Sequence, residues 1–294
     1  MINWKYPPKS SLVAQHVECY WCIEKKTHDD GHPFPKLTPD PTAHLIIAPA
    51  EQGYLYQSDS ASFEGQGSHW LFPHCQTFEI DHTDAFIILG VKFHTGALYS
   101  LDMTPHQAVL EQVVKLDVTA FFDSAHQKHG DNCNQVPDLE RQDISRALLQ
   151  LAQTSPENCC DTLEAVLQPW LHQASSDKHS LLTRKALPLL PNTLISQLGT
   201  LLHCSQRTLE RSFTRVTGLT LKQCQSMNRL DLLLESLYLR GETDIDWAEV
   251  AQEFGFSDQP HLIRYLKNTI GKTPGEYAKV RDLTIDIYGG VEYS

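Results

Sequence analysis

The chain has 294 residues and a mass of 33.3 kDa, which is enough for two domains that each bury a core. Hydrophobic residues make up 41% of the chain and charged residues 20%, so a largely disordered protein is excluded. The net charge of −12 disfavours nucleic-acid binding by the chain as a whole, because neutralising phosphates requires Lys and Arg.

The amino-terminal segment carries no targeting signal. MINWKYPPKSSLVAQ (residues 1–15) lacks the apolar core and cleavage site of a signal peptide, and no apolar run in the chain approaches about 18 residues. We therefore expect a cytoplasmic protein with no membrane partner. The eight cysteines do not have the regular spacing of a small secreted domain, so we expect most of them to be reduced and buried.

Residues 1–118 are predicted to form a β-rich regulatory domain. The runs AHLIIAPA (43–50), TFEIDH (77–82) and AFIILGVKFH (85–94) are β-branched and aromatic, and Gly, Pro and Asp separate them. The prolines between Pro33 and Pro41 indicate a loop between the first strands. Short strands at this spacing predict a small barrel or sandwich.

This domain also contains the densest set of potential metal ligands. They are His69, His74, Cys75, Glu79 and His82. A cupin enzyme normally carries His-x-His followed by an acid and another His, and that pattern is absent. Scattered histidines are the favoured interpretation, so we predict no metal and no other cofactor. The alternative is a metal-dependent, cupin-like enzyme with the helical region as an accessory.

Cys19 and Cys22 form a single Cys-x-x-Cys on a predicted strand. Such a pair is typical of a redox site or half of a zinc site, but no second pair exists in the chain. A structural role is the favoured interpretation. A redox- or metal-responsive regulator is kept as an alternative.

From residue 119 to residue 177 the sequence predicts a helical connecting segment. ALLQLA (147–152) and DTLEAVLQPW (161–170) have helical spacing, and the polar stretch His126–Gln135 is expected to be a loop or linker.

A repeat follows in the last third of the chain. Leu198–Thr220 and Val250–Thr273 each predict a short helix, a tight turn and a second helix that ends at glycine. Positions after the turn, such as Arg211 and Arg264, are 53 residues apart, whereas His203 and Gly255 before it are 52 apart. The second turn is therefore one residue longer than the first.

In the first copy, Asn192 or Thr193 is expected to cap a helix over 194–203, and Ser205 to cap a helix over 206–217 that Gly218 ends.

The helix over 206–217 has two faces. Leu209, Phe213 and Val216 are spaced to pack inward, whereas Arg207, Arg211 and Arg215 lie together on another face. Arginine is suited to bidentate contact with guanine edges and phosphates, so this face is predicted to bind DNA. Glu210 on the same helix is suited either to a cytosine amino group or to an ion pair with an arginine.

In the second copy, Asp246 and Glu249 predict a capping box for a helix through Phe254. The recognition helix is expected over 258–270, and Pro260 is tolerated in its first turn. Its outward residues are Gln259, His261, Arg264 and Lys267.

One long helix, Thr220–Leu239, is predicted between the copies. Its length of about 30 Å is close to the 34 Å or so between successive major grooves. Residues 192–281 carry 11 Lys and Arg against 10 Asp and Glu, whereas residues 1–191 carry 13 against 23. The acidity therefore lies mostly outside the repeat.

Residues 178–283 resemble the DNA-binding domain of the AraC/XylS family of transcription regulators. The resemblance rests on SQRTLERSFTRVTG, NRLDLLLESL and GFSDQPHLIRYLKNTIGKTPGEY. It implies base- or backbone-facing roles for Arg207, Glu210 and Arg211 in the first copy, and for Gln259, His261, Ile263 and Arg264 in the second. Pro260 and Ala278 depart from the family pattern, and Leu262 and Leu266 replace Phe.

LGVKFHTGALYSLDMTP (89–105) resembles the amino-terminal domain in one group of these regulators, although His94 and Thr95 replace an Arg-Pro pair. Such domains are cupin-like barrels that bind an effector or mediate dimerisation, so the resemblance implies a small-molecule effector and a homodimer as partners besides double-stranded DNA.

The sequence thus predicts an α+β protein that is not an enzyme. An N-terminal cupin-like β-barrel or sandwich domain is followed by an all-α domain with two helix-turn-helix motifs and a tail, 284–294. We expect the first copy to supply most of the sequence reading, and the second to fix register and phosphate contact.

Overall fold

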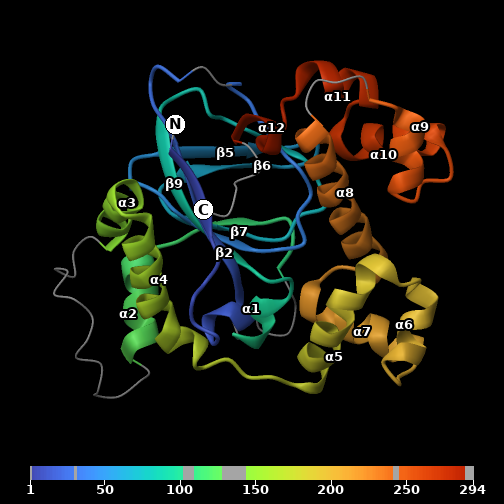
Figure 1. Cartoon of the computed structure of the whole chain (residues 1–294). Coiled ribbons are helices and arrows are strands. Elements are labelled where there is room, and N and C mark those ends of the chain that lie inside the picture. Colours follow the sequence, from blue (N-terminus) through green and yellow to red (C-terminus); the bar gives the residue numbers. More distant parts are fainter. Residues whose placement is uncertain (1, 30–31, 102–108, 128–143, 241–244, 289–294) are drawn as a thin grey trace.

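The computed structural model describes residues 2–29, 32–101, 109–127, 144–240 and 245–288. Two β-sheets lie at the centre, with helices α2, α3 and α4 on one side and the helical carboxy-terminal region on the other (Figure 1). Most of the predicted linker, His126–Gln135, lies outside the described residues. Within the described ranges, no helix is long and apolar enough to cross a membrane.

The sheets are antiparallel and confirm the predicted β-rich domain. The larger has the strand order β1-β2-β9-β4-β7-β10 and the smaller β3-β8-β5-β6. The larger sheet consists of β1 (Ile2–Tyr6), β2 (Val17–Lys25), β9 (Phe86–Phe93), β4 (His44–Ile47), β7 (His69–Leu71) and β10 (Val113–Lys115). The smaller consists of β3 (Lys36–Leu37), β8 (Phe78–Ile80), β5 (Gly53–Gln57) and β6 (Ser62–Gln66).

One face of the larger sheet shares a core with three helices. These are α2 (Val118–Gln127), α3 (Ile144–Thr154) and α4 (Pro156–Leu171). The ring of Trp70 on β7 lies 6.3 Å from that of Trp170 on α4, and Trp4 Nε1 donates a hydrogen bond to the Ala152 carbonyl. The helices that the sequence assigned to a connecting segment therefore complete the core of the sheets. We call residues 2–171 the β-domain. It also contains a 3₁₀ turn (Val13–Gln15) and α1 (Ala97–Ser100).

The carboxy-terminal region is helical, as predicted. Its helices are α5 (Lys178–Ala186), a 3₁₀ helix (Leu187–Asn192), α6 (Ile195–Leu201), α7 (Gln206–Thr217), α8 (Leu221–Arg240), α9 (Trp247–Glu253), α10 (Gln259–Ile270), α11 (Pro274–Val280) and α12 (Thr284–Tyr288). They form two units with separate cores, and α8 connects them (Figure 1). The first half of α8 contributes Leu221, Cys224 and Met227 to the first core, and its second half contributes Leu230, Leu233, Leu234 and Leu237 to the second.

The helix ends follow the predicted capping signals, with two corrections. Asp246 caps α9, because its Oδ1 accepts hydrogen bonds from Ala248 N at 2.9 Å and Glu249 N at 3.2 Å, but among the described residues Glu249 does not make the reciprocal bond of the predicted capping box. Ser205 Oγ accepts a hydrogen bond from Thr208 N at 3.1 Å, and Gly218 ends α7 at a φ of 75°. Neither Asn192 nor Thr193 caps α6, because residues up to Asn192 form a 3₁₀ helix. The N-cap of α6 is Leu194, which makes no side-chain cap.

Both turns of the repeat contain a residue in the left-handed region. His203 has a φ of 53° in the first turn and Gly255 a φ of 70° in the second. These two residues are 52 positions apart, which is the sequence offset before the turn. The two turns thus require the same left-handed backbone conformation. Glycine adopts it without steric cost, whereas histidine adopts it at a cost.

Candidate nucleic-acid interface

The first helix-turn-helix unit exposes two unpaired arginines on α7. Leu209, Phe213 and Val216 are buried on the opposite face, which fixes the rotation of the helix. Arg207 and Arg211 are exposed, and within the described part of the chain neither makes an ion pair or a side-chain hydrogen bond. Their guanidinium groups are therefore available to an external acceptor.

A shallow groove runs beside these arginines, between α7 and the start of α8. Its volume is about 530 Å³, and its lining includes Arg207, Glu210, Arg211, Thr214, Thr220 and Lys222. Glu210 Oε1 accepts a hydrogen bond from Gln206 Nε2 at 2.9 Å, so in this structure Glu210 pairs with its own helix. Lys222, which is exposed, was not predicted as a site residue, because it lies beyond the repeated motif and only the fold places it beside α7.

Arg215 differs from the other two arginines of the predicted face. Its Nε donates a hydrogen bond to the Tyr99 hydroxyl of the β-domain at 2.9 Å, and that hydroxyl donates to Asp177 Oδ2 at 2.9 Å. The helical spacing of the three arginines is as predicted, but the carboxy-terminal end of α7 lies against another domain. In this arrangement Arg215 is engaged by protein rather than free.

The second unit exposes fewer cations. Asp258 Oδ1 accepts a hydrogen bond from His261 N at 2.7 Å and thereby caps α10, and Pro260 falls in the first turn as predicted. Gln259, Arg264 and Lys267 are exposed, whereas His261 and Ile263 are half-buried. The His261 ring lies 5.3 Å from that of Phe256, and its Nδ1 lies 3.2 Å from Ser257 Oγ.

Arg229 of α8 was not anticipated from the sequence. Its guanidinium lies 4.4 Å from the centre of the Phe256 ring and 5.0 Å from that of Tyr265, so it stacks against the second unit. Tyr265 also donates a hydrogen bond to the Ser226 carbonyl at 2.7 Å. These contacts fix α10 relative to the linker helix.

The β-domain has an open pocket of about 1180 Å³ at one end of the two sheets. The pocket is lined by parts of β2, β5, β6 and the start of β9, including Lys25, Tyr54, Glu64 and Phe86. The Tyr54 ring lies over Gly65 beside the pocket, and a Cβ at Gly65 would lie 2.4 Å from the Tyr54 hydroxyl, so a larger residue there would displace this ring.

The histidines of the predicted ligand set are separated, and protein atoms satisfy them. His69 Nδ1 donates to the Gly67 carbonyl and Nε2 accepts from the Tyr56 hydroxyl, both at 2.9 Å, and burial lowers the pKa of His69 to about 4. His74 Nε2 lies 3.0 Å from the Thr38 carbonyl. Cys75 is half-buried, Glu79 is exposed, and His82 contacts Tyr288. Among the residues that the structure describes, no three His, Cys, Asp or Glu side chains gather where they would hold a metal ion.

Cys19 and Cys22 are both buried on β2. Residues three apart on a regular strand point to opposite faces, so the two thiols do not face each other. Burial raises the pKa of Cys19 to about 11 and that of Cys22 to about 12. Because the thiolate is the reactive form, these environments disfavour redox chemistry at neutral pH.

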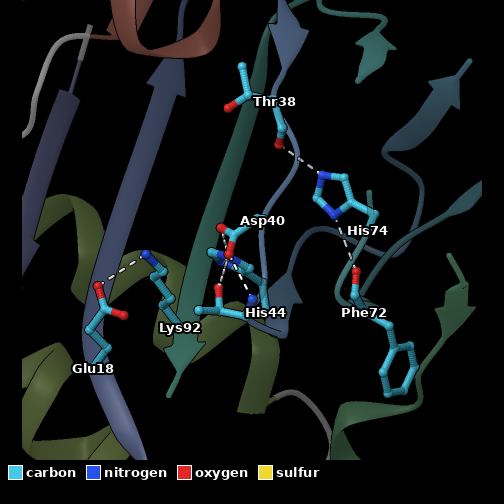
Figure 2. Close-up of polar contacts among 8 residues, drawn as sticks. Glu18, Thr38, Asp40, His44, Phe72, His74 and Lys92 are labelled. Atoms are coloured by element: carbon cyan, nitrogen blue, oxygen red, sulfur yellow. Dashed lines mark hydrogen bonds and ion pairs between the residues drawn. The ribbon is translucent and has the colours of Figure 1, made fainter. Parts of the chain in front are cut away.

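A charged network lies in the β-domain near His74 (Figure 2). Asp40 Oδ2 lies 3.1 Å from His44 Nε2, and its Oδ1 accepts a hydrogen bond from Thr42 N at 2.7 Å. Lys92 of β9 pairs with Glu18 of β2 at 3.0 Å. Burial opposes the charge on Asp40, but the Lys92 charge and the His44 and Thr42 hydrogen bonds outweigh it, so the pKa of Asp40 is well below its usual range.

The network predicts a loss of stability in acid. Folding lowers the pKa of Asp40, so its carboxylate stabilises the folded state fully only above pH 3.8, the ordinary pKa of an aspartate. This stabilisation is lost as the pH falls below that value. Asp40→Asn is expected to lower the free energy of unfolding by roughly 1–3 kcal/mol at neutral pH. Urea unfolding of the β-domain at several pH values measures this. The difference from the unmodified chain should be constant near neutrality and shrink below about pH 4. The exposed residue Asp59, changed to Asn, is the matched control. A pH-independent difference would contradict the assignment.

Two family models match separate parts of the chain. Residues 198–279, from α6 to α11, match a model described as a helix-turn-helix domain. Residues 5–115, which contain most of the two sheets, match a model described as a domain of unknown function (DUF6597).

The solved structures that the chain matches have low sequence identity and low TM-scores. An apo variant of ToxT from Vibrio cholerae strain SCE256 is 11% identical, with a TM-score of 0.45 over 95% of this chain and 100% of its own. Wild-type ToxT of the same strain, with an unsaturated fatty acid bound, is 11% identical, with a TM-score of 0.41 over 90% of this chain and 94% of its own. The AraC-like transcriptional activator CuxR is 12% identical, with a TM-score of 0.25 over 74% of each chain. At these values the similarities say nothing about what this chain binds.

Proposed function

We propose that this chain is a DNA-binding transcription regulator of the AraC family, and that it inserts α7 and α10 into successive major grooves of double-stranded DNA. The supporting observation is the pair of exposed arginines on α7, Arg207 and Arg211, which no described residue pairs with and which lie beside the groove that contains Lys222. The 20 residues of α8 span about 30 Å, which suits two helices placed one turn of DNA apart.

The two units differ in what they offer to DNA, and we propose different roles for them. On α7, Arg207 and Arg211 are the readers, and Glu210 joins them if it leaves Gln206. On α10, Gln259, His261, Ile263 and Arg264 face the second groove, and Lys267 binds phosphate. Arg215 is assigned to the contact with Tyr99 rather than to DNA.

For the rest of the chain we propose a sensor that has no enzymatic activity. The whole regulator would work in the cytoplasm, where it binds DNA. The β-rich part, 1–118, with the helical segment 119–177, would bind a small-molecule effector in the open pocket between the sheets and control the DNA-binding part, 178–283. Association of two chains stays a prediction from the family resemblance.

Selecting bound fragments from genomic DNA with the full chain tests this proposal. We expect an enriched site with two protected segments whose centres are about 10 base pairs apart, because each recognition helix occupies one major groove. Binding should weaken steeply with salt, since phosphate contacts release counterions. A protected region confined to one groove would contradict the two-helix arrangement, and absence of any enriched site would contradict sequence-specific binding.

A further inference from the structure

The β-domain contacts both recognition helices at equivalent positions of the repeat. Gly96, at a φ of 76°, lies so close to α7 that an added Cβ would be 2.8 Å from Val216 Cγ1. Thr77 Oγ1 donates a hydrogen bond to the Thr269 carbonyl of α10 at 2.5 Å. Val216 and Thr269 are 53 residues apart, which is the offset of the repeat after its turn. The β-domain therefore contacts the recognition helix of each copy at the same position of the repeat.

These contacts lie near the carboxy-terminal ends of α7 and α10. Helix-turn-helix proteins contact base edges mainly with the amino-terminal residues of the recognition helix. On α7 those residues include Arg207 and Arg211, and on α10 they include Gln259 and Arg264, all of which stay exposed. The β-domain therefore positions the two helices without covering their reading ends.

The second unit is held to the β-domain by a further segment, Asp282–Tyr288, which we call the C-terminal clasp. Lys36 N of β3 donates a hydrogen bond to the Asp282 carbonyl at 2.8 Å, and Leu283 forms a parallel bridge with Lys36. Tyr288 is buried, with its hydroxyl bonded to His82 Nδ1 and its ring edge-on to Phe86. Figure 1 places α12 between the smaller sheet and α11.

The same segment is anchored in the second unit. Leu283 is fully buried in its core. The Tyr277 hydroxyl donates a hydrogen bond to Asp286 Oδ1 at 3.0 Å, and Asp282 pairs with Lys272. Because the clasp is fixed at both sides, a movement of the β-domain at β3 or His82 is transmitted to the unit that contains α10.

We propose that the β-domain sets the placement of α10 relative to α7 through the C-terminal clasp, and that the clasped arrangement is the one that binds a two-groove site. The inference rests on the proposed function and adds its regulation. The open pocket adjoins the clasp, because Phe86 and Lys25 line it and Lys25 Nζ donates to the His82 carbonyl at 2.6 Å. A molecule in the pocket would act on α10 by this route.

Two conservative variants of the full chain test the clasp. Tyr288→Phe removes the hydroxyl that bonds His82, and Thr77→Val removes the donor to Thr269 while leaving the helical units unaltered. Binding is measured to two DNA probes, the selected full site and the same site with the second half scrambled. We expect each variant to weaken binding to the full site by about tenfold, since the second contact loses its preorganisation. Binding to the half-site probe should be unchanged.

Hydrogen exchange supplies a readout without DNA. The Lys36 amide, which donates to Asp282, should exchange faster in Tyr288→Phe than in the unmodified chain. Tyr238→Phe is the matched control, because Tyr238 makes no hydrogen bond in the described part of the chain. Unchanged or tighter binding to the full site in both clasp variants would overturn the inference. Failure of the unmodified chain to prefer either probe over random DNA would instead overturn the proposed function.

Discussion

Replacing Arg211 with alanine is expected to weaken binding to the cognate site by roughly 1–3 kcal/mol, about 5- to 150-fold, at fixed salt. Arg211 is exposed and unpaired within the described residues, so the free protein loses no internal contact when it is removed. The full effect then falls on the complex, where the guanidinium would have bonded a base edge or a phosphate. Titration of the selected fragment by fluorescence anisotropy measures the change.

Arg184→Ala is the matched control for Arg211→Ala. It removes the same charge from the same helical unit, but Arg184 lies on α5, outside the recognition helix. Its charge contributes to lowering the pKa of His16 in the β-domain. A loss of affinity caused only by weaker electrostatic attraction to DNA would be equal in both variants. A loss caused by removal of a specific DNA contact would be seen only in Arg211→Ala. Measuring binding to random DNA as well separates a base contact from a phosphate contact, because only a base contact changes the ratio of specific to random binding. Equal losses in the two variants would show that α7 is not the reader.

Phe213→Ala is expected to destabilise the first helix-turn-helix unit by about 3–5 kcal/mol. The side chain is fully buried in the first core with Leu198, Leu209 and Leu219, so its removal leaves a cavity as well as losing apolar contact. The loss should appear as faster hydrogen exchange along α6 and α7. Exchange in α10 should change little, because the second core shares only the helix α8 with the first.

Leu266→Ala is the corresponding change in the second unit, 53 residues further along the repeat. Leu266 is also fully buried, and its loss is expected to cost about 2–5 kcal/mol and to affect α9 and α10. The pair of variants therefore tests whether the repeat forms two separately stable cores. Loss of protection throughout both units in either variant would contradict that division and would mean that α8 makes them one cooperative core.

The sequence predicted the elements that depend on local signals. The glycine stops at Gly218 and Gly271, the cap at Ser205 and the apolar stripe of α7 were confirmed. These features are readable because a cap, a left-handed residue or a helical period depends on neighbours within about four residues. The exceptions were the start of α6, where a 3₁₀ helix displaces the expected cap, and the start of α9, where Asp246 caps the helix without the reciprocal Glu249 bond among the described residues.

The candidate site was predicted in part. Spacing alone placed Arg207, Arg211 and Arg215 on one face, and this is correct within α7. It did not reveal that the last of them meets Tyr99, which lies 116 residues away in sequence. Lys222 and Arg229 were missed because neither belongs to the repeated motif, and only the folded chain brings them beside α7 and α10.

By itself, then, the sequence determined the two helix-turn-helix motifs and most of their helix boundaries, because periodicity, caps and repeat offsets are encoded over short distances along the chain. Only the tertiary structure decided what each outward face meets. It joined the helices of the connecting segment to the core of the sheets, placed Arg215 in a hydrogen bond with Tyr99 of the β-domain, and placed residues 282–288 where they hold the second unit on the β-domain. These outcomes depend on packing between segments that are far apart in the sequence. A side chain of given type and spacing has the same local pattern whether it contacts water, DNA or another domain.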